Sequence, residues 1–118
     1  MAADDLPVDG CALVIVQAEP GGTSVRADRA LAGALRAFAT DVHAGGAAAV
    51  LTLPSVPPEL AQALMAQVAK ASARRTPTTQ RLLKLTRALR ATILRHEPSP
   101  DAFEVAYDVC VFTMPGKA

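Results

Sequence analysis

Residues 11–17, CALVIVQ, decide the fold. They form a continuous apolar run, rich in β-branched side chains, between Gly10 and the turn sequence Pro20-Gly21-Gly22. A short run that is apolar throughout is typical of a strand buried on both faces of a parallel sheet. We therefore expect this segment to be the central strand of an α/β domain.

Helical periodicity follows this strand. Thr23 or Ser24 can cap a helix. On its buried face, apolar residues recur at spacings of 4, 3 and 4, at Leu31, Leu35, Phe38 and Val42. The pair Gly45-Gly46 is a C-terminal signal. Residues 47–53, AAAVLTL, then predict a second short, buried strand that ends at Pro54.

Two further helices and a third strand complete the chain. Pro57, Pro58 and Glu59 indicate the start of the second helix. The third begins after Thr76-Pro77, and its buried positions are Leu82, Leu85, Leu89 and Ile93. Residues 103–113 alternate at first and are then apolar, which predicts a strand that enters the sheet from a half-exposed edge.

The order strand, helix, strand, helix, helix, strand predicts an α/β, three-layer domain with a small, mostly parallel three-stranded sheet. We expect residues 1–118 to form a single domain, with residues 1–9 and 114–118 flexible. Three strands leave two sheet edges, and proteins seldom leave such edges bare. We expect another chain or a second copy to complete the sheet at an interface formed by Phe103, Val105, Tyr107 and Val109.

Composition excludes several functional classes. No apolar run reaches the ~18–20 residues that span a bilayer, so we expect a soluble protein with no membrane partner. Residues 1–10 carry three acids and no basic residue, which is unlike a secretory signal and favours a cytoplasmic location. Cys11 and Cys110 lie in apolar runs without a CxxC motif or a Cys/His cluster, so we expect no metal and no cofactor.

Charge is distributed unevenly along the chain. Residues 60–96 carry eight basic side chains and no acid, whereas the rest carries four basic side chains and eleven acids. We interpret the basic stretch as a solvated face or as a docking surface for an acidic protein partner or a second copy, with the residues Arg74, Arg75, Arg81, Lys84, Arg87 and Arg90. A nucleic-acid binder that uses the third helix is an alternative, which the lack of aromatic residues in this stretch disfavours.

The turn after the first strand offers a second alternative. Gly21, Gly22, Thr23 and Ser24 lie between a predicted strand and a predicted helix, where backbone N–H groups can cradle a phosphate or a nucleotide. The turn lacks both GxGxxG and GxxxxGK[ST], so we favour a plain tight turn.

Several stretches resemble, in order and spacing, the C-terminal half of the CHAT domain, a bacterial relative of caspases. They are LVIVQAEPG at residues 13–21, residues 31–65, ALRATIL at residues 88–94 and AFEVAYDVCVFTMPG at residues 102–116. The resemblance implies the caspase-hemoglobinase fold. It also implies that the last strand lies at a dimer two-fold.

The resemblance further implies that the chain has no catalytic residues. Ala18 occupies the position of the family's nucleophilic cysteine, and no strand precedes residue 11 to supply the activating histidine. A cysteine nucleophile needs a histidine within hydrogen-bond reach. His43 and His96 lie at predicted helix ends, so we expect neither to pair with Cys110. The sequence therefore favours a noncatalytic interaction or regulatory subunit.

Overall fold

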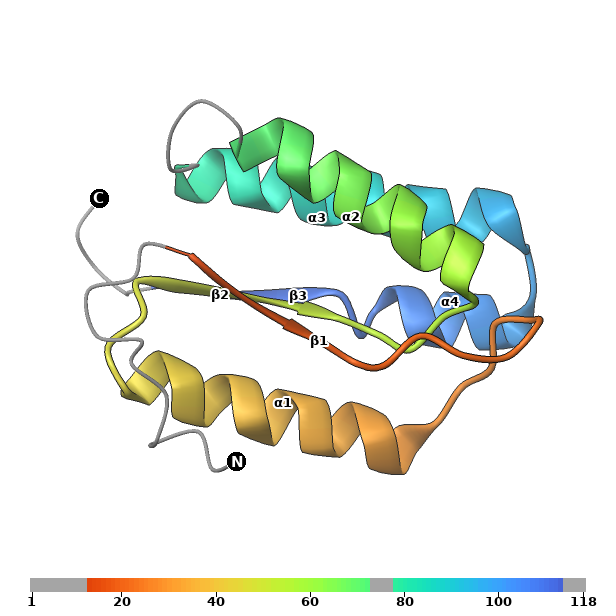
Figure 1. Cartoon of the computed structure of the whole chain (residues 1–118), viewed down its shortest axis with the longest axis horizontal. Coiled ribbons are helices and arrows are strands. Elements are labelled where there is room, and N and C mark those ends of the chain that lie inside the picture. The colour runs from red at the N-terminus through yellow and green to blue at the C-terminus, as the bar shows by residue number, and fades with distance from the viewer. Residues whose placement is uncertain (1–12, 73–77, 114–118) are drawn as a thin grey trace.

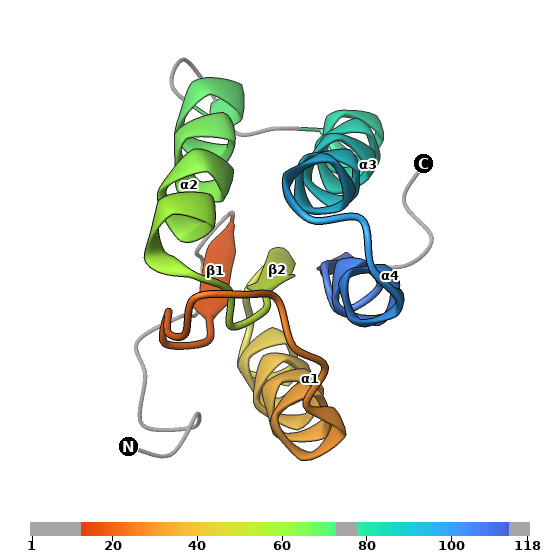
Figure 2. The ribbon, with the colours of Figure 1, turned by 90° about the vertical axis from the view of Figure 1, so that its right-hand side faces the viewer.

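The computed structural model describes residues 13–72 and 78–113. The elements along the chain are β1 (Val14–Gln17), α1 (Arg29–Ala44), β2 (Ala49–Leu53), α2 (Pro58–Ser72), α3 (Thr79–His96), α4 (Pro100–Ala106) and β3 (Cys110–Thr113). Helices α2 and α3 cover one face of the sheet and α1 covers the other (Figures 1 and 2). The predicted three-layer α/β fold is confirmed. The termini predicted to be flexible, residues 1–9 and 114–118, lie outside the described residues.

The sheet is mixed and has the order β1-β2-β3. Strands β1 and β2 are parallel, with Val14 opposite Val50, whereas β2 and β3 are antiparallel, with Thr52 opposite Cys110. The central strand is therefore β2, and our assignment of residues 11–17 to that place was wrong. The sheet is also not mostly parallel. Because α2 and α3 run out and back, the chain returns to the end where β2 stopped, so β3 must run in the opposite direction (Figure 1).

The first helix starts later than expected. It begins at Arg29, where the Asp28 side chain caps it by accepting a hydrogen bond from the backbone N–H of Leu31 at 3.0 Å. Neither Thr23 nor Ser24 is the cap. Residues 18–28 instead form a connecting segment, named the strap here.

The last predicted strand is mostly a helix. Residues 100–106 form α4, where Ser99 Oγ accepts from the N–H of Ala102 at 3.1 Å and Pro100 occupies the first turn. Our strand assignment for residues 103–109 was therefore wrong, and only Cys110–Thr113 pairs in the sheet. The alternation of residues 103–109 misled the prediction, because the buried set Ala102, Val105, Ala106 and Val109 also fits a helical face that continues past its last turn.

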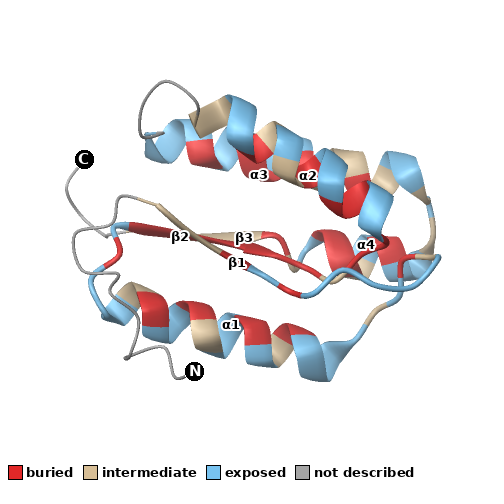
Figure 3. Cartoon of the chain, viewed as in Figure 1, coloured by how far each residue is buried: buried red, intermediate tan, exposed pale blue. Residues whose placement is uncertain are grey.

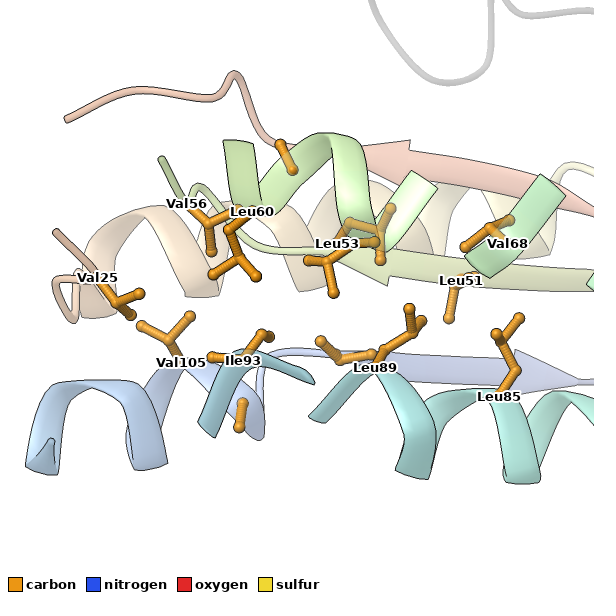
Figure 4. Close-up of a cluster of buried hydrophobic side chains, with 14 of the residues drawn as sticks. Val25, Leu51, Leu53, Val56, Leu60, Val68, Leu85, Leu89, Ile93 and Val105 are labelled. Carbon is orange, nitrogen blue, oxygen red and sulfur yellow. The ribbon is translucent and has the colours of Figure 1, made fainter. Parts of the chain in front are cut away.

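Two apolar clusters flank the sheet. The larger one lies between the sheet and the pair α2–α3 (Figure 4), and it includes the predicted positions Leu82, Leu85, Leu89 and Ile93. The smaller one lies between the sheet and α1, around Leu35, Ala39 and Val42. All five residues of β2 are buried, as Figure 3 shows. Within the described ranges, no helix is both long and apolar enough to cross a membrane.

Candidate functional site

The basic residues of α3 lie on two different sides of the helix. Arg81 and Lys84 lie on the side that faces α2, where they border an open groove of about 490 Å³. We name this feature the basic groove, and its lining is Gln67, Lys70, Ala71, Arg81, Lys84, Leu85 and Ala88. Three side chains are cationic, three are apolar and none is acidic. The predicted Arg74 and Arg75 lie outside the described residues.

Arg90 lies on the other side of α3. Its Nη2 and Nε donate to the backbone carbonyl of Val109 at 2.8 and 3.2 Å, and its guanidinium carbon lies 5.2 Å from the centre of the Tyr107 ring. These contacts tie α3 to the turn between α4 and β3. Arg90 therefore has a structural role, and Arg87 is an exposed neighbour. The predicted residues that the structure describes, Arg81, Lys84, Arg87 and Arg90, therefore do not form one continuous surface.

Strand β3 is the exposed edge of the sheet next to α3 and α4. Each of its four residues is only half-buried, in contrast to the fully buried β2. Leu83, which is 48% exposed, lies two turns before Arg90 on the same side of α3. Within residues 13–72 and 78–113 no strand pairs with the outer side of β3 or β1. We name β3, Leu83 and Tyr107 the edge face.

The four residues predicted as a sheet-edge interface have different environments. Val105 and Val109 are buried in the core, whereas Phe103 and Tyr107 lie one turn apart on α4 and are 58% and 65% exposed. Two of the chain's four aromatic residues therefore face solvent. The Ser99-Pro100 pair was the signal in the sequence that could have identified this helix.

Two acidic residues of α4 contact the strap and the start of α1. Glu104 Oε1 lies 2.8 Å from Nε of Arg29, and this hydrogen bond and charge raise the pKa of the Arg29 guanidinium. Asp101 Oδ2 accepts from the N–H of Ala27 in the strap at 3.1 Å. Both carboxylates are therefore directed toward the strap and α1, whereas Phe103 is exposed on another side of α4.

The predicted anion loop borders a second cavity. Gly21, Gly22, Thr23 and Ser24 line a space of about 310 Å³ at the carboxyl ends of the parallel strands. The loop does not lead directly into a helix, because α1 begins only at Arg29. Its walls also include the carboxylates of Asp28 and Asp108. This mixture of charges is unlike a phosphate cradle, so the structure does not favour the phosphate alternative.

Asp108 is the titratable group of this cavity whose pKa is perturbed. Its side chain is 15% exposed, and burial raises the pKa of the carboxyl above its ordinary value. Nη1 of Arg36 lies 3.7 Å away and lowers the pKa, whereas the charge of Glu104 raises it further. The effect of burial is the largest of the three.

The residues considered as catalytic candidates do not form a pair of nucleophile and general base. Ala18 follows β1 and is buried, and its N–H donates to the carbonyl of Leu53 at 3.0 Å. Cys110 Sγ lies 3.2 Å from the carbonyl of Tyr107, and no hydrogen bond among the described residues joins it to His43 or His96. In the part of the chain that the structure describes, no three His, Cys, Asp or Glu side chains are grouped as metal ligands.

No family model, curated protein or solved structure matches this chain in the comparisons. The surfaces that the fold creates are therefore the features that bear on its function.

Proposed function

We propose that this chain is a noncatalytic interaction subunit, which assembles with another protein chain through the edge face. The partner is a second copy of this chain or a different protein. The resemblance to the C-terminal half of a CHAT domain supports the proposal, because it implies that the last strand lies at a dimer two-fold.

The observation that carries the proposal is the half-buried state of β3. An edge strand presents unpaired backbone N–H and C=O groups, and a strand from another chain can pair with them. The side chains of Cys110, Val111 and Phe112 are each only partly covered. A partner that paired with this edge would satisfy the backbone groups and remove apolar surface from water.

A further observation concerns the surroundings of this edge. Helix α3 runs antiparallel to β3, and Arg90 contacts Val109, the residue just before β3. Leu83 lies two turns earlier in α3, about 10 Å away along the helix. This distance is similar to the length of three residues of a strand. Leu83 therefore lies alongside the C-terminal end of β3, and Tyr107 lies near the N-terminal end of the same strand. A partner that covered β3 would therefore also remove these two exposed side chains from water.

The nucleic-acid alternative has weaker support. The basic side chains lie on two sides of α3, and Arg90 is already engaged with Val109. The lining of the basic groove contains no aromatic residue on which a base could stack. A protein partner accounts better for a surface that combines apolar and charged groups.

A charge on the edge face tests the proposal. Leu83→Glu should lower the weight-average mass of the protein at micromolar concentrations, measured by light scattering, without changing its circular dichroism spectrum. Leu31→Glu is the matched control, because Leu31 is 40% exposed but lies on α1 across the sheet. Equal masses for the unmodified protein and the Leu83 variant would contradict assembly through this face.

A further inference from the structure

The cavity at the carboxyl ends of β1 and β2, named the strap cavity here, joins parts of the chain that lie far apart in the sequence. The strap, the start of α1 and α4 share one end of the long axis (Figure 1), and all three contribute to its lining. Its volume is about 310 Å³, near the lower end of the roughly 300–1,000 Å³ typical of small-ligand sites. The carboxyl ends of parallel strands are a common place for such sites. The strap cavity therefore has the place and the size of a site for a small molecule.

The strap lines this cavity with hydrogen-bond donors that have no partner. The backbone N–H groups of Gly22, Thr23 and Ser24 donate to no acceptor among the described residues. Arg26 is exposed, lines the same cavity and forms no ion pair within residues 13–72 and 78–113. A guanidinium and neighbouring backbone N–H groups are donors that commonly bind a carboxylate. This part of the cavity can therefore receive an anion.

Asp108 presents an unpartnered acceptor to the same cavity. Its side chain is only 15% exposed, and its carboxylate accepts no hydrogen bond from the described residues. Nη1 of Arg36 is 3.7 Å away, beyond hydrogen-bond distance, and Arg36 lines the neighbouring cavity between α1 and α4. A buried carboxylate without donors is costly, so a ligand that brings donors is favoured. An ammonium group supplies three donors together with the opposite charge.

The rest of the lining decides what lies between these groups. Its apolar residues are Leu31, Ala32, Leu35 and Val105. None of the lining residues is aromatic, and the other carboxylate, that of Asp28, already caps α1. A purely anionic ligand would meet the charge of Asp108, and a purely cationic ligand would meet that of Arg26. A small ligand with both charges and an aliphatic group fits all three parts of the cavity.

We propose that the strap cavity binds a free aliphatic α-amino acid. The ammonium group donates to the carboxylate of Asp108, and the ligand carboxylate accepts from Arg26 and from the strap N–H groups. The aliphatic side chain packs against Leu31 and Leu35. This small-molecule site is a second function of the chain and is separate from the edge face, so each proposal can fail without the other.

Calorimetric titration of the protein with L-leucine tests the proposal. Two analogues each remove one charge, because 3-methylbutylamine lacks the carboxylate and 4-methylpentanoate lacks the ammonium group. L-Leucine should bind, and each analogue should bind at least about tenfold more weakly, since hydrogen bonds to a charged group are lost. Leu83→Glu, on the edge face, should bind L-leucine as the unmodified protein does.

Matched variants locate the ligand. Asp108→Asn should weaken L-leucine binding by about tenfold or more. Asp41→Asn makes the same change in charge at an exposed position of α1 and should have no effect. Arg26→Gln should also weaken binding, with Arg95→Gln, exposed on α3, as its control. Circular dichroism checks that each variant is folded, and the amide resonances of residues 22–24 should shift when L-leucine is added.

Three results would overturn the site. L-Leucine that produces neither heat nor amide shifts up to about 10 mM overturns binding itself. An analogue that binds as tightly as L-leucine overturns the need for both charges, and with it an amino acid as the ligand. Unchanged affinity in both Asp108→Asn and Arg26→Gln places the ligand elsewhere and overturns the strap cavity as its site.

Discussion

The hydroxyl of Thr52 donates a hydrogen bond of 2.7 Å to the backbone carbonyl of Asp108. The same oxygen accepts one from the N–H of Cys110 at 3.0 Å. Thr52 is completely buried in β2, among apolar neighbours. A single side chain therefore satisfies two backbone groups of the turn where the chain leaves α4 and enters β3, and it fixes the start of the edge strand.

Thr52→Val should destabilise the protein by about 1–3 kcal/mol, since it leaves a backbone donor and a backbone acceptor without their partner. Urea denaturation measures this loss. Thr40→Val, at an exposed position of α1, is the control and should change stability by no more than about 0.5 kcal/mol. A Thr52 variant as stable as the control would show that the turn does not depend on this hydroxyl.

The sequence predicted those parts of the fold that have a strong local pattern. The spacing of Leu82, Leu85, Leu89 and Ile93 located α3, and Pro58 located the start of α2. The direction of β3 had no local signal, because it depends on how many long helices separate it from β2. The alternation through Phe103 and Tyr107 matched the pattern of a strand by chance. The segment is a helix instead, because Ser99 caps its N-terminus.

The surfaces were only partly predictable for a similar reason. The basic residues of α3 were identified from charge alone, but their division into two sides follows from which face α2 covers. Lys70 and Arg81 are eleven residues apart, and the groove between them exists only because the two helices pack together. The exposed Phe103 could be recognised as part of a surface only after α4 was known.

Asp108→Asn should make the protein more stable at pH 7. Burial raises the pKa of the Asp108 carboxyl above its ordinary value of 3.8, so the folded state keeps the proton to higher pH than the unfolded state. The free energy of unfolding therefore falls as the pH rises from the unfolded-state pKa of Asp108 to its folded-state pKa. Above this interval the full cost of burying the charged carboxylate applies. Asn carries no charge and avoids this cost.

The advantage of the Asn variant over the unmodified protein should shrink as the pH falls toward 3.8. Urea midpoints at pH 7, 5 and 4 measure the difference. Asp41→Asn, at an exposed position of α1, is the control. A variant that is less stable than the unmodified protein at pH 7 would mean that attraction to Arg36 outweighs burial.

Glu97→Ala should loosen the strap at Val25, where it contacts the C-cap of α3. Both carboxylate oxygens of Glu97 accept from the N–H of Val25, at 3.2 and 3.1 Å, and Val25 is 2% exposed. Loss of the acceptor leaves a buried donor, at a cost of about 1–3 kcal/mol. Amide exchange at Val25 should become faster, whereas Glu97→Gln, which keeps an acceptor, should retain most of the protection. Identical exchange in the two variants would exclude this anchoring role.

Peptide hydrolysis should be absent in the purified protein. Cys110 has no hydrogen-bonded histidine among the described residues, and a neutral thiol is a weak nucleophile. A panel of fluorogenic peptides at neutral pH measures turnover, with Cys110→Ala as the control. Turnover that disappears in the Cys110 variant would contradict a noncatalytic subunit.

Amide exchange of β3 at increasing protein concentration tests the central claim most directly. If another copy pairs with the edge face, the outward-facing amides of Cys110–Thr113 should become protected as the concentration rises from 5 to 200 μM, while those of the fully buried β2 stay unchanged. Leu83→Glu should abolish this dependence. Exchange of β3 that is the same at every concentration, together with the mass of one chain and cooperative unfolding, would contradict assembly through this edge.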